Sequence, residues 1–232
     1  MSKIFSYVVR YDEGAAPNPF WGTCTLTICK PAIRRSANIG DWIIGTGSKN
    51  AKCNDGNTYD LSDSIVYAMK VSAMMTMQQY DLYCKDNLPT KIPNWRTKDW
   101  RDRMGDCIYD YSNGSNPTIR LSVHNEENRQ TDLSGMNALL SLQFYYFGEA
   151  AINLPMNLLP LIQRNRGYRK IENQELITEF EKWIGKFEKN KIYADPQMRY
   201  VFDRQKVPDA KISSCAKKHV TEDKDETEET YC

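Results

Sequence analysis

The sequence predicts a single α+β domain built on a mixed, strongly bent or barrel-like β-sheet with helices packed against it. Its 232 residues, 41% of them apolar, are enough to bury one substantial core. Several short segments alternate apolar with polar side chains, a period of two that is typical of half-buried strands. Residues 175–189 carry apolar side chains at helical spacing, which predicts an amphipathic helix that covers the sheet.

The stretch from Phe20 to Ser48 predicts the centre of this sheet. Residues 23–28 alternate apolar side chains with threonines, which indicates a half-buried strand. Residues 41–46 contain the run Trp-Ile-Ile, which is apolar on both faces, as a fully buried strand is. A short basic connection, residues 30–36, and a turn at 38–40 join the two strands.

The remaining elements follow from the same patterns. The other predicted strands are 4–11, 65–71, 107–111, 119–123 and 139–147. The run Thr76-Met77-Gln78-Gln79 is a capping-box pattern, so a helix should begin near Met77 and run to about residue 85. Residues 155–166, closed by Gly167, predict a second helix.

Composition excludes several classes of protein. Seven cysteines, an odd number at irregular spacing, favour reduced thiols in a cytoplasm over a disulfide framework. With only two histidines, we expect no metal site, and no cofactor motif is present. The chain has no apolar run of transmembrane length and no secretory signal, so we predict a cytoplasmic protein with no membrane partner. The oligomeric state stays open.

The charge is unevenly distributed. Residues 1–215, the predicted domain, carry 28 basic and 24 acidic side chains, whereas residues 216–232 form an acidic tail that we expect to be disordered. A mildly basic body with an acidic tail is typical of a nucleic-acid binder whose tail competes for the basic surface. The alternative is a solvated tail without a role.

Several motifs along residues 4–169 carry a resemblance to a known family. In order, the main ones are Tyr7-Val8-Val9-Arg10-Tyr11-Asp12, Ala16-Pro17-Asn18-Pro19-Phe20, Gly40-Asp41-Trp42-Ile43, Tyr67-Ala68-Met69-Lys70-Val71, His124-Asn125-Glu126-Glu127-Asn128 and Phe144-Tyr145-Tyr146-Phe147-Gly148. Together they resemble the second nucleotide-modification-associated domain family. The resemblance implies a link to systems that make, recognise or attack modified bases in bacterial and phage DNA.

Two of these segments are also similar, more loosely, to the PUA-like group, which includes the EVE, ASCH and YTH modules. The likeness lies in the strand at 41–46 and the strand at 65–71. It implies a PUA-like core, in which a flipped modified base sits in a pocket on a small barrel.

The candidate catalytic residues lie at strand ends. Standard signatures for nucleotide hydrolysis, dinucleotide redox chemistry and zinc deamination are absent from the sequence. His124 follows a predicted strand, and a neutral imidazole can donate to or accept from a base edge near pH 7. Asp132 can act as base or stabilise a sugar cation, and we rank it ahead of Asp106 because it lies in the same segment as His124. The alternative for each is a structural role.

The candidate base-binding residues surround the same region. They are Asn18, Phe20, Asp41, Trp42, Asn128, Tyr145 and Tyr146. The aromatic members can stack on a base, and the amides can read its edge. The alternative is that the aromatic side chains belong to the core and that the aspartates form turns.

Two basic segments are candidates for nucleic-acid contacts. Their members are Lys30, Arg34, Arg35, Arg96, Lys98, Arg101 and Arg103. The second segment interleaves its cations with Trp95 and Trp100, a pattern typical of surfaces that bind a single strand of nucleic acid. The alternative is that the tryptophans cover the edge of the core.

Two functions fit these residues, both with modified-base DNA as the partner. The first is a metal-independent DNA glycosylase, an N-glycosidic bond hydrolase that flips and excises a hypermodified base, for example a glucosylated one, in anti-phage defence. The second is a reader that binds the base without catalysis. A modifying enzyme that uses a diffusible cosubstrate is disfavoured because the chain has no phosphate-binding loop motif.

Overall fold

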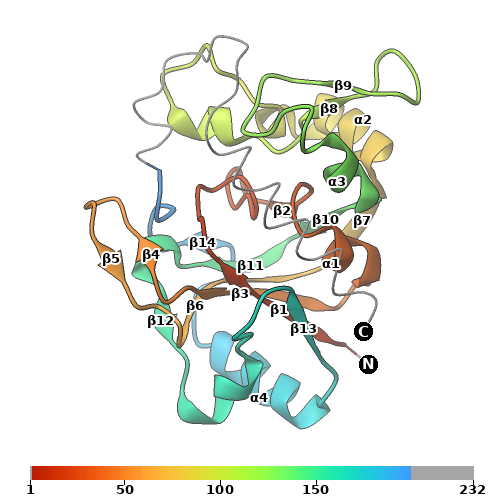
Figure 1. Ribbon diagram of the computed structural model, residues 1–232. Coiled ribbons are helices and arrows are strands. Elements are labelled where there is room, and N and C mark those ends of the chain that lie inside the picture. The colour runs from red at the N-terminus through yellow and green to blue at the C-terminus, as the bar shows by residue number, and fades with distance from the viewer. Residues whose placement is uncertain (1, 200–232) are drawn as a thin grey trace.

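The computed structural model describes residues 2–199, and its centre is a seven-stranded mixed sheet (Figure 1). Six strands lie in the order β13 (Tyr168–Ile171), β1 (Ile4–Val9), β3 (Trp42–Gly47), β6 (Ser64–Lys70), β11 (Gln143–Tyr146) and β14 (Lys191–Ile192). The seventh, β12 (Ile152–Asn153), pairs with β6. β1 and β3 are parallel, whereas β13 is antiparallel to β1 and β6 is antiparallel to β3.

A smaller antiparallel sheet and several helices complete the fold. The smaller sheet has the order β2 (Cys24–Leu26), β10 (Asn137–Ser141) and β7 (Ala73–Thr76). Two short hairpins are formed by β4 (Ala51–Lys52) with β5 (Thr58–Tyr59), and by β8 (Tyr109–Asp110) with β9 (Thr118–Ile119). The α-helices are α1 (Pro31–Ser36), α2 (Met77–Asn87), α3 (Arg129–Ser134) and α4 (Gln174–Ile184). The 3-10 helices are η1 (Pro89–Lys91), η2 (Trp100–Met104), η3 (Gly148–Ala150) and η4 (Met156–Leu161).

The main sheet is covered on both faces, which explains its apolar central strand. Figure 1 shows α4 on one side of the sheet and the smaller sheet with α2 and α3 on the other. Trp42 and Ile44 pack towards α4 in a cluster that contains Phe180. Ile43 points the opposite way and packs with Leu26 of the smaller sheet. Because alternate side chains of a strand face opposite sides, the run Trp42-Ile43-Ile44 of β3 is apolar on both faces.

Most strand and helix predictions are confirmed, with shifted ends. The predicted strands 4–11, 23–28, 41–46 and 65–71 correspond to β1, β2, β3 and β6. The predicted capping box opens α2, where Thr76 Oγ1 accepts from the backbone N–H of Gln79 and the Gln79 side chain accepts from Thr76. The predicted helix 175–189 is α4, which packs on the sheet as expected and ends at Ile184.

Other predictions about single elements need correction. The predicted strand 139–147 is two strands in different sheets, β10 and β11, which change direction at the exposed Leu142. The predicted strands 107–111 and 119–123 contract to the two-residue strands β8 and β9. The predicted helix 155–166 is the 3-10 helix η4, because Pro160 cannot donate an α-helical hydrogen bond. The basic connection at 30–36 forms the helix α1, with Pro31 at its first position.

The fold is α+β, and its main sheet does not close into a barrel. In the described part of the chain, its ends are β13 and β14, each paired with one neighbour. A PUA-like core therefore stays a prediction. Among residues 2–199, no helix has the length and apolar character needed to cross a membrane. The acidic tail, residues 216–232, lies outside the described residues.

Candidate functional site

A large cleft lies at the edge of the main sheet where β1 and β3 end. Because these strands are parallel, the residues that follow them meet at one edge. Arg10 and Tyr11 follow β1, and residues 48–50 follow β3. β13 is antiparallel to β1, so the segment that precedes it, residues 163–167, reaches the same edge. The cleft that these segments enclose has a volume of about 1160 Å³.

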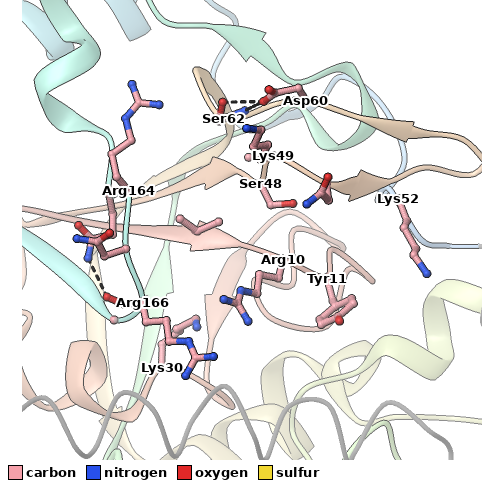
Figure 2. Close-up of a pocket in the computed structure, with 16 residues that line it drawn as sticks. Arg10, Tyr11, Lys30, Ser48, Lys49, Lys52, Asp60, Ser62, Arg164 and Arg166 are labelled. Atoms are coloured by element: carbon pink, nitrogen blue, oxygen red, sulfur yellow. Dashed lines mark hydrogen bonds between the residues drawn. The ribbon is translucent and has the colours of Figure 1, made fainter.

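The lining of the cleft is strongly cationic. It includes six basic side chains, Arg10, Lys30, Lys49, Lys52, Arg164 and Arg166, and one acidic side chain, Asp60 (Figure 2). The carboxylate of Asp60 accepts hydrogen bonds from Ser62, which lower its pKa, so it stays ionised at neutral pH. Arg164 pairs with Asp63 at 2.8 Å, but both groups are exposed and such a pair is weak in water.

Tight packing holds the loop that forms one wall of the cleft. Gly47, the last residue of β3, lies against Leu61, and a β-carbon at this position would collide with the Leu61 side chain and carbonyl. The loop 60–62 therefore crosses directly over the end of β3. Ser48 and Asn50 add a hydroxyl and an amide group to the lining, so the cleft offers neutral donors between its cations.

A second cluster, which we call the His124 cluster, is built from Cys29, Tyr109, His124 and Asp132. One carboxylate oxygen of Asp132 lies 2.6 Å from Nδ1 of His124 and 2.9 Å from the hydroxyl of Tyr109. The other oxygen accepts from the backbone N–H of Cys29 at 3.0 Å. The sequence predictions named His124 and Asp132, and the fold brings them together. The fold adds Cys29, which the sequence indicated only as one of seven reduced thiols.

The charge of Asp132 fixes the tautomer of the histidine. Burial raises the pKa of Asp132, but the charge and hydrogen bond of His124 and the charge of Arg34 outweigh it, so the pKa lies below the usual value. An ionised carboxylate can only accept hydrogen bonds, so Nδ1 of His124 carries the proton. In the neutral ring, Nε2 is then an acceptor, and it lies 3.5 Å from Sγ of Cys29.

The His124 cluster adjoins the cationic cleft. A narrow crevice is lined by Tyr11, Glu13, Ala15, Ala16, Ile28, Cys29, Val123 and His124. Tyr11 also lines the cleft, and so does Lys30, the residue that follows Cys29. The crevice is too narrow in this structure to admit a water molecule.

The third predicted catalytic residue, Asp106, lies in a different buried network. Its carboxylate accepts from the hydroxyls of Thr25 at 2.6 Å and Tyr80 at 2.8 Å. Burial raises its pKa, and the nearby Lys91 opposes this shift. Lys91 is fully buried and donates to Asn18 and Thr23. These contacts tie the segment before β2 to η1, which is a structural arrangement.

The predicted base-binding residues are all buried in the described structure. None of the seven appears in the lining of the cleft. The side chain of Asn18 bonds to Met104 and Lys91, and that of Asn128 accepts from the backbone of Asn125. The Asp41 carboxylate accepts from the backbone N–H of Asn38 in its own turn and from that of Lys3 just before β1. A base-binding role for these residues stays a prediction.

The aromatic members of that set pack in the core. Trp42 stacks near Tyr145 and meets Phe180 edge to face. Phe20 lies edge to face with Trp100. The hydroxyl of Tyr146 donates to Asp12 at 2.5 Å. A stacking slot needs an open ring face, and these rings are covered by protein.

Of the seven predicted nucleic-acid contacts, Lys30 alone lines the cleft in the described structure. Arg34 is fully buried and donates to the carbonyls of Thr27 and Asp132, so we do not retain it as a phosphate contact. Arg35 donates to Ser134 at the surface. Arg96, Lys98 and Arg101 are exposed but lie outside the lining of the cleft, as does Arg103.

Trp95 and Trp100 are both buried, as the alternative interpretation of their segment proposed. The guanidinium groups of Arg103 and Arg101 lie over their rings. The tryptophans thus cover the edge of the core and present no open face to a base.

The remaining cleft cations, Arg10, Lys49, Lys52, Arg164 and Arg166, were not singled out in the sequence. A weak signal existed, since Arg10 sits at the end of a predicted strand and Lys49 follows another. The pair Arg164 and Arg166 precedes β13, a strand that the sequence patterns did not indicate.

The fold and the site define an α+β protein with a cationic cleft beside a buried Cys–His–Asp cluster. The chain belongs to the nucleotide modification associated domain 2 (Nmad2) family, which matches residues 1–204 and confirms the resemblance seen in the motifs. The name of the family links it to nucleotide modification. No curated protein and no solved structure matches the chain. Within residues 2–199, no group of three or more His, Cys, Asp or Glu side chains could hold a metal ion.

Proposed function

We propose that the protein binds DNA that carries a modified base, with the sugar-phosphate backbone held in the cationic cleft. The observation that carries this proposal is the gathering of six basic side chains around one opening with a single acidic side chain. Such a surface attracts polyanions, and each phosphate it neutralises releases counterions from the DNA. Membership of the Nmad2 family supports a nucleotide as the ligand.

The size and lining of the cleft favour a segment of nucleic acid over a small metabolite. Its volume of about 1160 Å³ exceeds the roughly 300–1,000 Å³ typical of small-molecule pockets. Serine, asparagine and glutamine side chains in the lining can donate to phosphate and sugar oxygens. Tyr11 is half-buried at the junction of cleft and crevice, where its ring can support a base that leaves the stack.

Excision of the modified base, a DNA glycosylase activity, is one candidate for what happens after binding. The observation that favours it is the His124–Asp132 pair at the crevice beside the cleft, because an imidazole oriented by a carboxylate can act as a general base once the crevice opens to water. The oxygens of Asp132 are engaged by three donors, so Asp132 would act by orienting His124 and not at the sugar itself. A reader without catalysis would need the cleft alone.

The test compares two sets of exposed cations. One variant changes Lys49 and Lys52 of the cleft to Ala, and the matched control changes Arg96 and Lys98 outside it. Affinity for modified and unmodified DNA is measured against salt concentration. The cleft variant should bind all DNA more weakly, and its salt slope should fall by about one unit per lost phosphate contact. The control should bind as the wild type does.

If the control variant binds DNA more weakly than the cleft variant does, the DNA-binding surface is instead the segment around Trp95 and Trp100. Unchanged affinity in both would reject the cleft as the binding surface. Counting abasic sites after incubation with modified DNA then separates excision from reading, since a reader binds selectively and leaves every base in place.

A further inference from the structure

Cys29 lies at a sharp turn between a strand and a helix. The turn follows β2 of the smaller sheet. Cys29 and Lys30 both adopt left-handed backbone angles, with φ of 58° and 46°. Pro31 then begins α1. Such angles are uncommon for residues other than glycine. The turn is held by the bond from the Cys29 backbone N–H to the Asp132 carboxylate, so the thiol and the carboxylate are positioned together.

The side chains of Cys29, His124 and Asp132 form a chain of three interacting groups. Sγ of Cys29 lies 3.5 Å from Nε2 of His124, and Nδ1 of the same ring lies 2.6 Å from Asp132. This order of thiol, imidazole and carboxylate is the arrangement that activates a cysteine nucleophile, in which the base is oriented by a third group. Tyr109 donates to the same carboxylate oxygen as His124 and restrains its position.

The other described cysteines lack this arrangement. Five free cysteines are described, all of them buried. Burial raises the pKa of Cys24 to about 12, and the pKa of Cys107 is also raised, by its interaction with Cys84 and by burial. His124 is the one histidine in the described residues, and its ring contacts Cys29. The contact with the one described histidine thus belongs to Cys29.

We propose that Cys29 is a nucleophile that hydrolyses an amide or ester bond in the substituent of a modified base, with His124 as its base and Asp132 as a positioning residue. The inference rests on the proposed function for its substrate, because the cleft would hold the phosphates of the same nucleotide. Tyr11 lines both the cleft and the crevice, and Lys30 of the cleft follows Cys29, which lines the crevice.

The reaction needs water and no other reactant. Sγ attacks the carbonyl carbon while its proton passes to Nε2 of His124, and the electron pair of the C=O bond moves onto oxygen. When that pair returns, the C–N or C–O bond breaks, the leaving amine or alcohol takes the proton from Nε2, and a thioester remains on Cys29. Water then attacks the thioester and gives a proton to Nε2. The carboxylic acid leaves, and Sγ regains that proton.

A carbonyl group is the substrate that suits this cluster. A thiolate adds readily to carbonyl carbon, and the histidine can serve first as base and then as acid for the leaving group. Excision of a base by attack of water at the sugar would not use the thiol. The cysteine thus distinguishes removal of a substituent from removal of the base.

The first experiment uses a small acyl donor, 4-nitrophenyl acetate, on the full-length protein. Intact-mass measurement and peptide mapping should find one acetyl group on Cys29 of the wild type. His124→Gln should slow this acetylation by on the order of 10²–10⁴. Asp132→Asn should also slow it and should change its pH profile, because the negative charge beside Nδ1 is lost. Cys53→Ala, which removes another buried cysteine, is the matched control and should react as the wild type does.

Two results would overturn the nucleophile. One is the absence of acetyl on Cys29 in the wild type. The other is an unchanged rate in His124→Gln when thermal unfolding shows that the variant is folded. Cys29→Ala serves as the check on the mapping, and it should lose the adduct while its unfolding midpoint shows that the fold is retained.

The second experiment tests the substrate. Oligonucleotides carry one base with an amide-linked substituent or, as a control, the same substituent through an ether. The wild type should release the acyl fragment or its amine partner from the first and leave the second intact, with no abasic sites. An intact amide together with acetylated Cys29 would reject the acylated base as substrate. If instead cleavage persists after Lys49 and Lys52 are changed to Ala with unchanged KM, the proposed DNA-binding cleft fails while the nucleophile stands.

Discussion

Replacing Asp132 by Asn should destabilise the protein strongly, although the two side chains have the same shape. The carboxylate accepts three hydrogen bonds, from Cys29, Tyr109 and His124, in a fully buried position. An amide has one accepting oxygen and one donating nitrogen. Whichever way it turns, its NH₂ group faces a donor, either the Cys29 N–H or the Nδ1–H of His124. The substitution also leaves Arg34, whose guanidinium donates to the Asp132 carbonyl, without its nearby negative charge.

The magnitude follows from these contacts. Breaking one side of a buried charged pair costs about 3–5 kcal/mol of unfolding free energy. The total stability of a domain is about 5–15 kcal/mol, so the variant should keep its fold with a much reduced margin. For a chain of this size, each kcal/mol lowers Tm by about 2–4 °C, which predicts a decrease of roughly 10 °C.

The assay is urea and thermal unfolding, with Asp55→Asn as the matched control. Asp55 is exposed, and its carboxylate accepts from Asn57 and Tyr59, so its replacement should change stability by less than about 0.5 kcal/mol. An Asp132→Asn variant as stable as this control would refute the assignment of an ionised, triply bonded carboxylate.

The pH dependence provides a further check on Asp132. Its pKa is lowered in the folded protein, so its contribution is fully present above the unfolded value of about 3.9 and is lost as the pH falls through the folded value. The stability difference between wild type and Asp132→Asn should therefore shrink below about pH 4.

Two other predictions concern the opposite case of a raised pKa and the acidic tail. Burial raises the pKa of Asp12 to about 7, so the folded protein holds this proton where the unfolded chain has lost it. Stability from this group should fall as the pH rises from about 4 to 7, and Asp12→Asn should remove that slope in urea unfolding at pH 5 and pH 8. Deletion of residues 221–232, six of which are acidic, should tighten non-specific DNA binding at low salt if the tail competes for the cleft. Equal affinity of the shortened and full-length chains would instead indicate a tail without that role.

Local patterns predicted many of the strands and helices because the burial of each face of an element determines which of its side chains are apolar. The alternation in residues 23–28 and the apolar run at Trp42 identified β2 and β3 because burial on one or both faces dictates these patterns. The single segment 139–147 was misjudged because both of its halves are apolar, and the change of sheet at Leu142 leaves only an exposed leucine as a signal.

The site was less predictable because the pairing of strands brings together residues that are far apart in the sequence. Arg10 and Arg166 lie at one cleft only because β1 pairs with β13, and the sequence gives no sign of that pairing. The run around Arg34 indicated a basic surface, but α1 turns the guanidinium inward over Gly135, where a side chain would collide with it. Cys29 and His124 are 95 residues apart, so their contact has no local pattern.

The connection between cleft and crevice limits which group of a bound nucleotide can react. Lys30 lines the cleft and Cys29 lines the crevice, and the α-carbons of adjacent residues are about 3.8 Å apart. In the proposed complex, a phosphate bound by Lys30 would lie beside the chain segment that carries the thiol. On the other side of the same junction, Tyr11 lines both spaces. In the proposed complex, the group that reaches Sγ would belong to the nucleotide at this junction, and the cations further along the cleft would hold the phosphates of neighbouring nucleotides. This arrangement favours a substituent on a base that has left its stack over a group attached elsewhere on the DNA.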